Sequence, residues 1–251
     1  MEPQRLKAGL GWKWIKQGYA LFMKAPLLWI VLLLICIFAL AALSAVPMLG
    51  EPLASLLLPA VLIGLMVGCR SLEQGEDLEL AHLVSGFKQH TAQLITLGGI
   101  TLVSQYLIFG VMMMVGGTEL VSILVSGQPE DPAIIQQAVN GAGIAMLLGI
   151  TLFCILVMAM QFAPMLVYFN NIAPVEAMKL SLRAFIRNVG PMLVYFTTFM
   201  FLAILASIPM MLGWLVLTPI VFTSLYVAYC DIFPLVNEAA TSQPAVPDTK
   251  A

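Results

Sequence analysis

Charged residues are scarce in this sequence. They make up 10% of the 251 residues, whereas 61% of the residues are hydrophobic. A soluble globular domain carries about 25% charged residues. Such a low fraction leaves too little polar surface to face water. The composition therefore excludes an ordinary soluble domain and favours an integral membrane protein.

The motifs of common nucleotide-binding and hydrolytic sites are also missing. The sequence contains no GxxxxGK[ST] loop, no GxGxxG after a strand, and neither HExxH nor GxSxG. The four cysteines form no CxxC pair, and His82 and His90, even with Glu79, are too far apart on a helix for a compact metal site. The scattered methionines are better explained by apolar packing than by copper binding. We therefore expect no cofactor, no metal and no enzymatic activity.

Basic residues are absent from alternate connections between the hydrophobic stretches. About 20 apolar residues cross the hydrocarbon core of a bilayer. Six spans are predicted on this basis, at residues 26–46, 53–69, 92–115, 142–169, 189–208 and 214–233. With the N-terminus in the cytoplasm, all 11 Lys and Arg residues lie on the cytoplasmic side. The charged residues of the opposite connections are all acidic. Because short loops rich in Lys and Arg remain cytoplasmic, both termini are predicted to be inside.

No ionisable side chain lies in the middle of a predicted span. Transporters coupled to protons or sodium usually place such a group at membrane depth. The deepest polar side chains here are the amides of Gln105 and Gln161, with Asn170 at the end of the fourth span. We predict hydrogen bonds between helices for these amides. Contact with a substrate is the alternative.

Asparagines and an aspartate gather at the predicted cytoplasmic interface. They are Asn170, Asn171, Asn188 and Asp231. The first two fit the end of a helix, and Asn188 fits a hinge between helices. A polar pocket for a lipid headgroup or for a partner's loop is the alternative interpretation.

Three cytoplasmic segments have the apolar periodicity of amphipathic helices. The first contains Trp14 and Tyr19, which are expected at headgroup depth. The second covers 77–90 with Asp77 as its predicted N-cap, and the third covers 174–188. Basic residues on the first and third helices are the predicted contacts with anionic lipid or a partner, namely Lys13, Lys16, Lys24, Lys179, Arg183 and Arg187.

Each amphipathic segment is followed by a pair of spans, which suggests a threefold repeat. The predicted units are 1–70, 71–170 and 171–236 within one membrane domain, and shared hydrophobic constraints are the alternative explanation. The middle unit carries an insertion at 117–141, where Asp131-Pro132 predicts the start of a short helix. Residues 237–251 are rich in Pro, Ala, Ser and Thr, and are predicted to form a disordered cytoplasmic tail.

Small residues and prolines mark particular spans. Gly64 and Gly68 form a GxxxG pair that favours a close helix contact within the molecule. Pro59, Pro164 and Pro219 are expected to kink the second, fourth and sixth spans, because proline lacks the backbone N–H that a helix needs.

Two segments resemble known bacterial sequences. The third amphipathic helix carries Ala177-Met178, then Ser181 and Asn188, and resembles an Ala-Leu-x-x-Ser…Asn pattern that precedes a span pair in uncharacterised inner-membrane families. These include the YciC-like proteins and the membrane domains of some glycerophosphodiester phosphodiesterases. The opening Gly11-Trp12-Lys13-Trp14, through 26–29, is similar to a proteobacterial family of six-span proteins. The resemblance implies a bacterial inner-membrane location and carries over no catalytic residue.

The sequence therefore predicts an all-α integral membrane protein with six transmembrane helices and three interfacial helices. The predicted function is non-enzymatic, through lateral contacts with lipids, chiefly anionic, or as an accessory, assembly or regulatory subunit of an inner-membrane complex. A transporter or flippase of a lipid-like substrate is the alternative, favoured by repeats and proline-broken helices. A membrane enzyme acting on lipids lacks a clustered base or metal. Nucleic acid is not an expected partner.

Overall fold

The computed structural model describes residues 2–126, 131–208 and 210–233. Every regular element in these ranges is a helix, which confirms the all-α prediction. The elements are α1 (Leu10–Phe22), α2 (Pro26–Ser44), α3 (Gly50–Gln74), η1 (Leu80–Phe87), α4 (Thr91–Met114), α5 (Thr118–Ser126), α6 (Pro132–Gly141), α7 (Gly143–Met160), α8 (Ala163–Asn170), α9 (Pro174–Arg187), α10 (Val189–Ser207) and α11 (Trp214–Ile232). The predicted tail at 237–251 lies outside the described residues.

Six helical segments are long and apolar enough to cross a membrane. They are α2, α3, α4, the α7–α8 pair, α10 and α11, at the positions that hydropathy predicted. Helix α3 is longer than the predicted span 53–69. It ends at Gly75, whose φ of 83° lies in the left-handed region that terminates helices.

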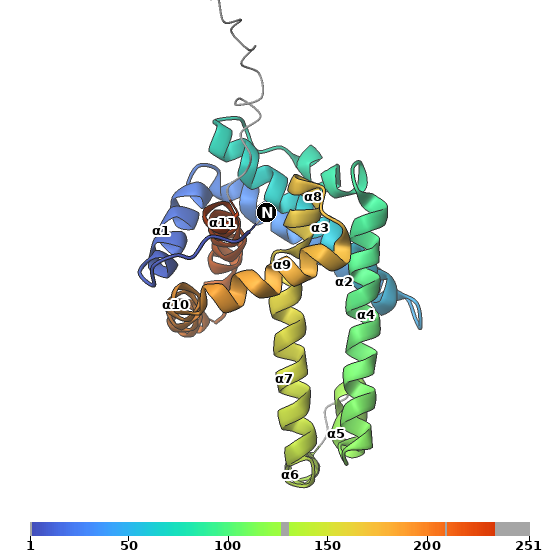
Figure 1. Ribbon diagram of the computed structural model, residues 1–251. Coiled ribbons are helices and arrows are strands. Elements are labelled where there is room, and N and C mark those ends of the chain that lie inside the picture. The colour runs from blue at the N-terminus through green and yellow to red at the C-terminus, as the bar shows by residue number, and fades with distance from the viewer. Residues whose placement is uncertain (1, 127–130, 209, 234–251) are drawn as a thin grey trace, which may run out of the picture.

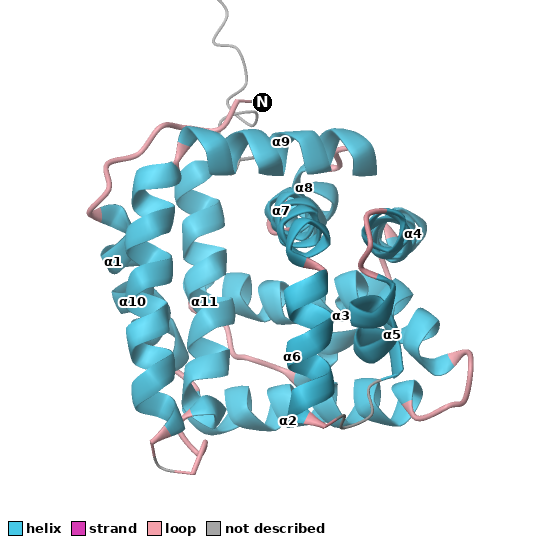
Figure 2. Cartoon of the chain, turned by 90° about the horizontal axis from the view of Figure 1, so that it is seen from below, coloured by secondary structure: helices cyan, strands magenta, loops and turns pink. Residues whose placement is uncertain are grey.

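The spans form three hairpins that point in different directions. Within the hairpins α2 contacts α3, α4 contacts α7, and α10 contacts α11, while α3 also contacts α4 and α11. In Figure 1, α4 and α7 run downward, with α5 and α6 at their far end. In Figure 2 the same pair is seen end-on, whereas α2, α10 and α11 lie across the view.

The amphipathic segments lie in a region that we call the hub: α1, η1, α8 and α9 with the span ends that they contact. Helix α1 packs on α10 and α11, η1 packs on α3, and α9 packs on α7 and α8. Thus η1 and α9 each contact the second span of the preceding hairpin, and α1 contacts the second span of the last hairpin. This order favours the predicted repeat of 1–70, 71–170 and 171–236, which stays a prediction.

The second segment differs from its prediction. It is a 3₁₀ helix that begins after Glu79, so Asp77 is not its N-cap. The Glu79 side chain accepts the backbone N–H of His82, and the Glu79 backbone N–H donates to Nδ1 of His82 at 3.1 Å. This reciprocal pair satisfies two backbone donors at the helix start, which is why the helix begins there.

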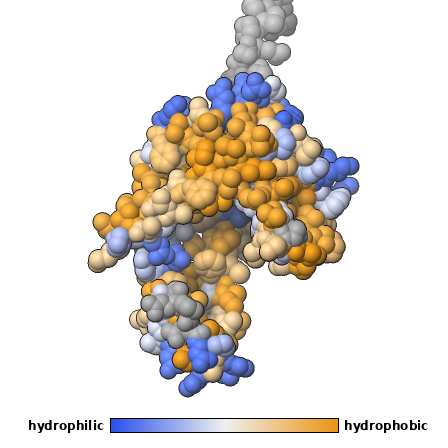
Figure 3. Space-filling view, turned by 180° about the vertical axis from the view of Figure 1, so that it is seen from behind, coloured by the Kyte–Doolittle hydropathy of each residue, from blue (hydrophilic) through white to orange (hydrophobic). Residues whose placement is uncertain are grey.

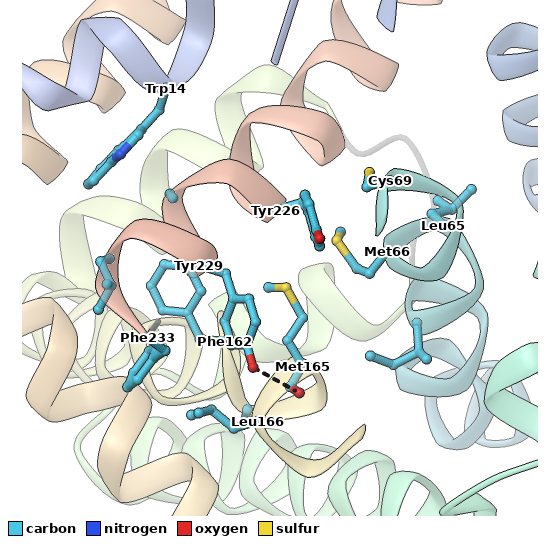
Figure 4. Close-up of a cluster of buried hydrophobic side chains, with 14 of the residues drawn as sticks. Trp14, Leu65, Met66, Cys69, Phe162, Met165, Leu166, Tyr226, Tyr229 and Phe233 are labelled. Atoms are coloured by element: carbon cyan, nitrogen blue, oxygen red, sulfur yellow. Dashed lines mark hydrogen bonds between the residues drawn. The ribbon is translucent and has the colours of Figure 1, made fainter. Parts of the chain in front are cut away.

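The first helix also lies differently from expectation. Trp14 is 0% exposed, whereas Trp12 and Tyr19 are 55% and 49% exposed. The prediction that Trp14 lies at headgroup depth is therefore wrong, because the apolar half of α1 faces α10 and α11 instead. Figure 4 shows Trp14 beside the buried cluster that contains Tyr229 and Phe233 of the C-terminal part of the chain.

Several local predictions are confirmed. Asp131 caps α6 by accepting the backbone N–H of Ala133 at 3.0 Å. The GxxxG pair makes internal contacts, because a Cβ added at Gly64 would lie 2.7 Å from Cα of Leu83. The fourth span is broken just before Pro164 in the first turn of α8, whereas Pro59 and Pro219 lie inside the continuous helices α3 and α11, where the expected kinks stay a prediction. Helix α5 was not predicted.

Candidate functional site

Close backbone contacts build the hub. A Cβ at Gly18 would lie 2.6 Å from the backbone N of Ser224, so α1 touches α11 without an intervening side chain. Thr223 strengthens this crossing by donating its hydroxyl to the carbonyl of Gly18 at 2.9 Å. On the opposite side of the hub, a Cβ at Gly86 of η1 would clash with the carbonyl of Ala60 in α3. Small residues therefore set the helix spacing at two of the three crossings.

The third crossing is made by a serine inserted into a broken helix. Ser181 of α9 is fully buried, donates its hydroxyl to the carbonyl of Met158 at 2.7 Å, and accepts the N–H of Phe162 at 3.1 Å. Within an uninterrupted helix these two backbone groups would bond to each other. The hydroxyl bridges them instead, and a side chain inserted in this way breaks a helix. It accounts for the separation of α7 from α8.

Asn188 holds the N-terminal segment against α9. It is 1% exposed, and its amide oxygen accepts the N–H of Leu6 at 2.8 Å. Its amide nitrogen donates to the carbonyl of Gln4 at 2.8 Å and of Ala184 at 3.0 Å. The Asn188 side chain thus anchors the N-terminal segment of the same chain. That segment takes the place of the partner's loop that the sequence had suggested as an alternative.

Helix α11 supplies three further polar contacts to the hub. Asp231 accepts the indole N–H of Trp14 at 2.8 Å, which ties α11 to α1. The hydroxyl of Tyr226 donates to Glu73 of α3 at 2.7 Å. Tyr229 donates to the side chain of Asn170, and its hydroxyl also lies 3.4 Å from a carbonyl of α8 (Figure 4). Asn170 therefore makes a contact between α8 and α11.

The exposed half of α9 has two parts. At 100° per residue, apolar side chains occupy one quarter of the helix and basic side chains occupy the neighbouring quarter. The apolar quarter consists of Val175, Leu182 and Ile186, and the basic quarter of Lys179, Arg183 and Arg187. Lys179 pairs with Glu176 at 2.8 Å, and Arg187 pairs with Glu2 at 3.4 Å. Both pairs are exposed, and such pairs contribute only about 0–1 kcal/mol.

The basic residues predicted on α1 and just after it are also exposed. Lys13, Lys16 and Lys24 all lie at the surface. The ammonium group of Lys24 donates a hydrogen bond to the carbonyl of Leu72, and Lys16 lies beside an apolar groove between α1, α10 and α11. The contacts of these residues with anionic lipid remain a prediction.

The two intramembrane glutamines do not meet. Gln105 lies half-buried on α4, whereas Gln161 lies in the break between α7 and α8. Gln161 lines a cavity of ≈ 290 Å³ where α3, α11 and the fourth span come together, and the rest of that lining is apolar. The predicted interhelical hydrogen bond is not seen for either glutamine side chain in the described part of the chain.

The histidines have structural roles. His82 takes part in the cap of η1, and its Nε2 lies 3.3 Å from the hydroxyl of Ser71. His90 packs edge-on against Tyr168, with ring centroids 6.1 Å apart. Among the residues that the structure describes, no group of three His, Cys, Asp or Glu side chains is placed to hold a metal ion.

A known bacterial protein resembles the whole chain. It is a probable inner membrane protein of Burkholderia thailandensis. The two sequences are 28% identical over an alignment of 269 residues, which covers 99% of this chain and 100% of that protein. No family model and no solved structure matches the chain. The chain is a multi-pass membrane protein. This conclusion rests on the likeness together with the six apolar helices. The resemblance to YciC-like proteins and phosphodiesterase membrane domains is not shown by these findings and stays a prediction.

In the sequence, Ser181 stands out only as part of a motif, whereas Asn188 is also interpreted as a hinge or as part of a polar pocket. Together with Ala177 and Ala184 they recur at the spacing of one helix face, and all four are buried. The signal was a stripe of small and polar residues opposite the charges. In a membrane protein such a stripe marks the face that packs closely on another helix.

Proposed function

We propose that this protein is a non-enzymatic component of the bacterial inner membrane that acts through lateral contacts with lipids or with another membrane complex. One observation carries the proposal: several polar side chains of the hub are engaged in internal contacts. Ser181, Asn188 and Asp231 each bond to groups of this chain. A catalytic group must instead lie within reach of a substrate.

The outward surface supports the same proposal. Figure 3 shows apolar side chains over most of one face, with polar patches along the upper edge and at the tip of the α4–α7 arm. Large exposed apolar side chains line the hairpins, among them Leu107 of α4, Leu147 of α7, and Leu193 and Phe201 of α10. The diverging hairpins present these faces to lipids or to the helices of a partner.

The structure offers less support for a transporter of a lipid-like substrate. The cavity of ≈ 290 Å³ beside Gln161 lies between three spans, as a substrate site would. Neither Gln105 nor Asn170 lines it. A single amide in an apolar cavity provides little to select a polar headgroup, so the accessory role is the better supported proposal.

Purification from native membranes tests the proposed function. We expect the protein, extracted in mild detergent, to co-elute with anionic lipid or with another inner-membrane protein, as identified by mass spectrometry. A soluble-domain bait carrying the same affinity tag is the control. Recovery of the protein with neither companion would contradict the proposal.

Sidedness is tested separately by reporter fusions. The proposed orientation keeps both termini in the cytoplasm, since basic residues are confined to that side. Alkaline phosphatase, which is active only outside the cytoplasm, should be active when fused after Gln128 and inactive after Gln74. The reverse pattern would place the hub outside, and the basic helices would then face the wrong leaflet.

A further inference from the structure

An apolar groove continues the apolar quarter of α9 along α7 and α10. It has a volume of ≈ 520 Å³ and lies between α7 on one side and α9 and α10 on the other. Ile186, which belongs to the apolar quarter of α9, and Val189, the first residue of α10, both line it. Phe153 and Val157 of α7 and Leu193 of α10 line its length. Figure 1 shows α9 crossing above α7 toward α10.

Two arginines lie on the helix that supplies part of this groove's lining. Arg187 stands between Ile186 and Val189 in the chain, and Arg183 lies one turn earlier on the same exposed half of α9. Arg183 is exposed, and Arg187 is held only by its exposed pair with Glu2. Both guanidiniums are therefore available to a phosphate, which they can bind through two parallel hydrogen bonds.

We propose that this groove holds an acyl chain of an anionic phospholipid whose phosphate is bound by Arg183 and Arg187. The occupant has the two features that the site offers: an apolar tail for the groove and a negative headgroup for the arginines. The buried face of α9 fixes the helix on α7 and α8, so the two parts of the site are held in register. The inference rests on the proposed function and names the lipid class and the place where it binds.

The groove also contains an exposed thiol, that of Cys154, which offers a way to fill it. Cys154→Trp places a large ring in the space of the tail and leaves the arginines intact. Leu147→Trp, on the same helix, is its control, because Leu147 is 69% exposed and lies outside the lining. Arg183→Gln with Arg187→Gln removes the charges, and Lys7→Gln with Lys88→Gln removes two exposed charges that lie outside α9 and are not among the predicted lipid contacts.

The full-length protein in detergent is titrated with dioleoylphosphatidylglycerol or dioleoylphosphatidylcholine, and the first bound lipid is followed by native mass spectrometry. Each basic residue near an anionic surface strengthens binding by about fivefold, so the arginine pair variant should bind phosphatidylglycerol roughly 25-fold more weakly. Cys154→Trp should weaken the binding of both lipids. The two control variants should bind as the wild type does. Glycerophosphoglycerol, the headgroup without tails, should not compete.

Three results would overturn the proposal: equal affinity for the two lipids, equal loss in the arginine and lysine pair variants, or competition by the tail-free headgroup. Loss of a co-purifying protein in Cys154→Trp, with phosphatidylglycerol binding unchanged, would assign the groove to a partner's helix instead. In those cases the proposed function survives if a companion still co-elutes from native membranes. It fails together with this inference only if neither lipid nor protein is recovered.

Discussion

Replacing Gly18 with leucine is expected to lower the free energy of unfolding by about 3 kcal/mol. A Cβ at this position would lie within 2.6–2.7 Å of three atoms of Ser224, two of which belong to the backbone. A backbone cannot move aside as a flexible side chain does, so α1 must separate from α11. The separation would also break the hydrogen bond from Thr223 to the carbonyl of Gly18.

Equilibrium unfolding in mild detergent, followed by tryptophan fluorescence, measures this loss. Gly9→Leu is the matched control, because Gly9 precedes the same helix and has no neighbouring atom within 4 Å of an added Cβ. Its effect should be within about 0.5 kcal/mol of zero. Equal stability of the two variants would show that α1 does not pack on α11 through this glycine.

The same crossing shows what the sequence could and could not predict. The spans were predicted because a long apolar run in a protein rarely forms anything other than a membrane-spanning helix. The divergence of the hairpins was not predicted, because hydropathy reports how apolar a helix is and contains no information about its direction. The glycines at the crossings become informative only once their partners are known. Gly18 and Ser224 lie in different predicted units, at opposite ends of the chain.

The third amphipathic helix was predicted with nearly the right bounds, but its packing partners were not predicted. On its apolar side Val175 is 54% exposed, whereas Phe185 is buried. The other buried residues of this helix are small, namely Ala177, Ser181 and Ala184. In lipid, apolar side chains gain little by leaving the bilayer, and close approach favours small side chains. Apolar periodicity alone therefore does not tell which side of such a helix packs on its neighbours.

The polar residues of the hub show the same limit. Asn170 and Asp231 were grouped by their predicted depth in the membrane, but their partners were not identified. Their partners are Tyr229 and Trp14, which are apolar enough to have been counted as span or interface residues. Each ring buries a large apolar surface and needs one hydrogen bond for its polar end. Both pairs depend on how α11 packs against α1 and α8, which hydropathy does not report.

Replacing Trp14 with alanine is expected to lower the free energy of unfolding by about 3–5 kcal/mol. Trp14 is fully buried between α1 and the C-terminal hairpin, and its ring lies 6.2 Å from that of Tyr195 between centroids. The substitution leaves a cavity and removes the hydrogen bond to Asp231. The cavity remains costly in a membrane protein, because helix packing supplies much of its stability.

Trp12→Ala separates this effect from a general need for tryptophan on α1. Trp12 lies two residues away and is 55% exposed, so its loss should change stability far less than the loss of Trp14. Trp14→Phe should fall between them, because phenylalanine fills much of the space and leaves the carboxylate of Asp231 without the indole N–H. All three are compared by unfolding in the same detergent. If Trp12→Ala were as damaging as Trp14→Ala, both tryptophans would act at the membrane surface, and the closure of the hub by α1 on α11 would be refuted.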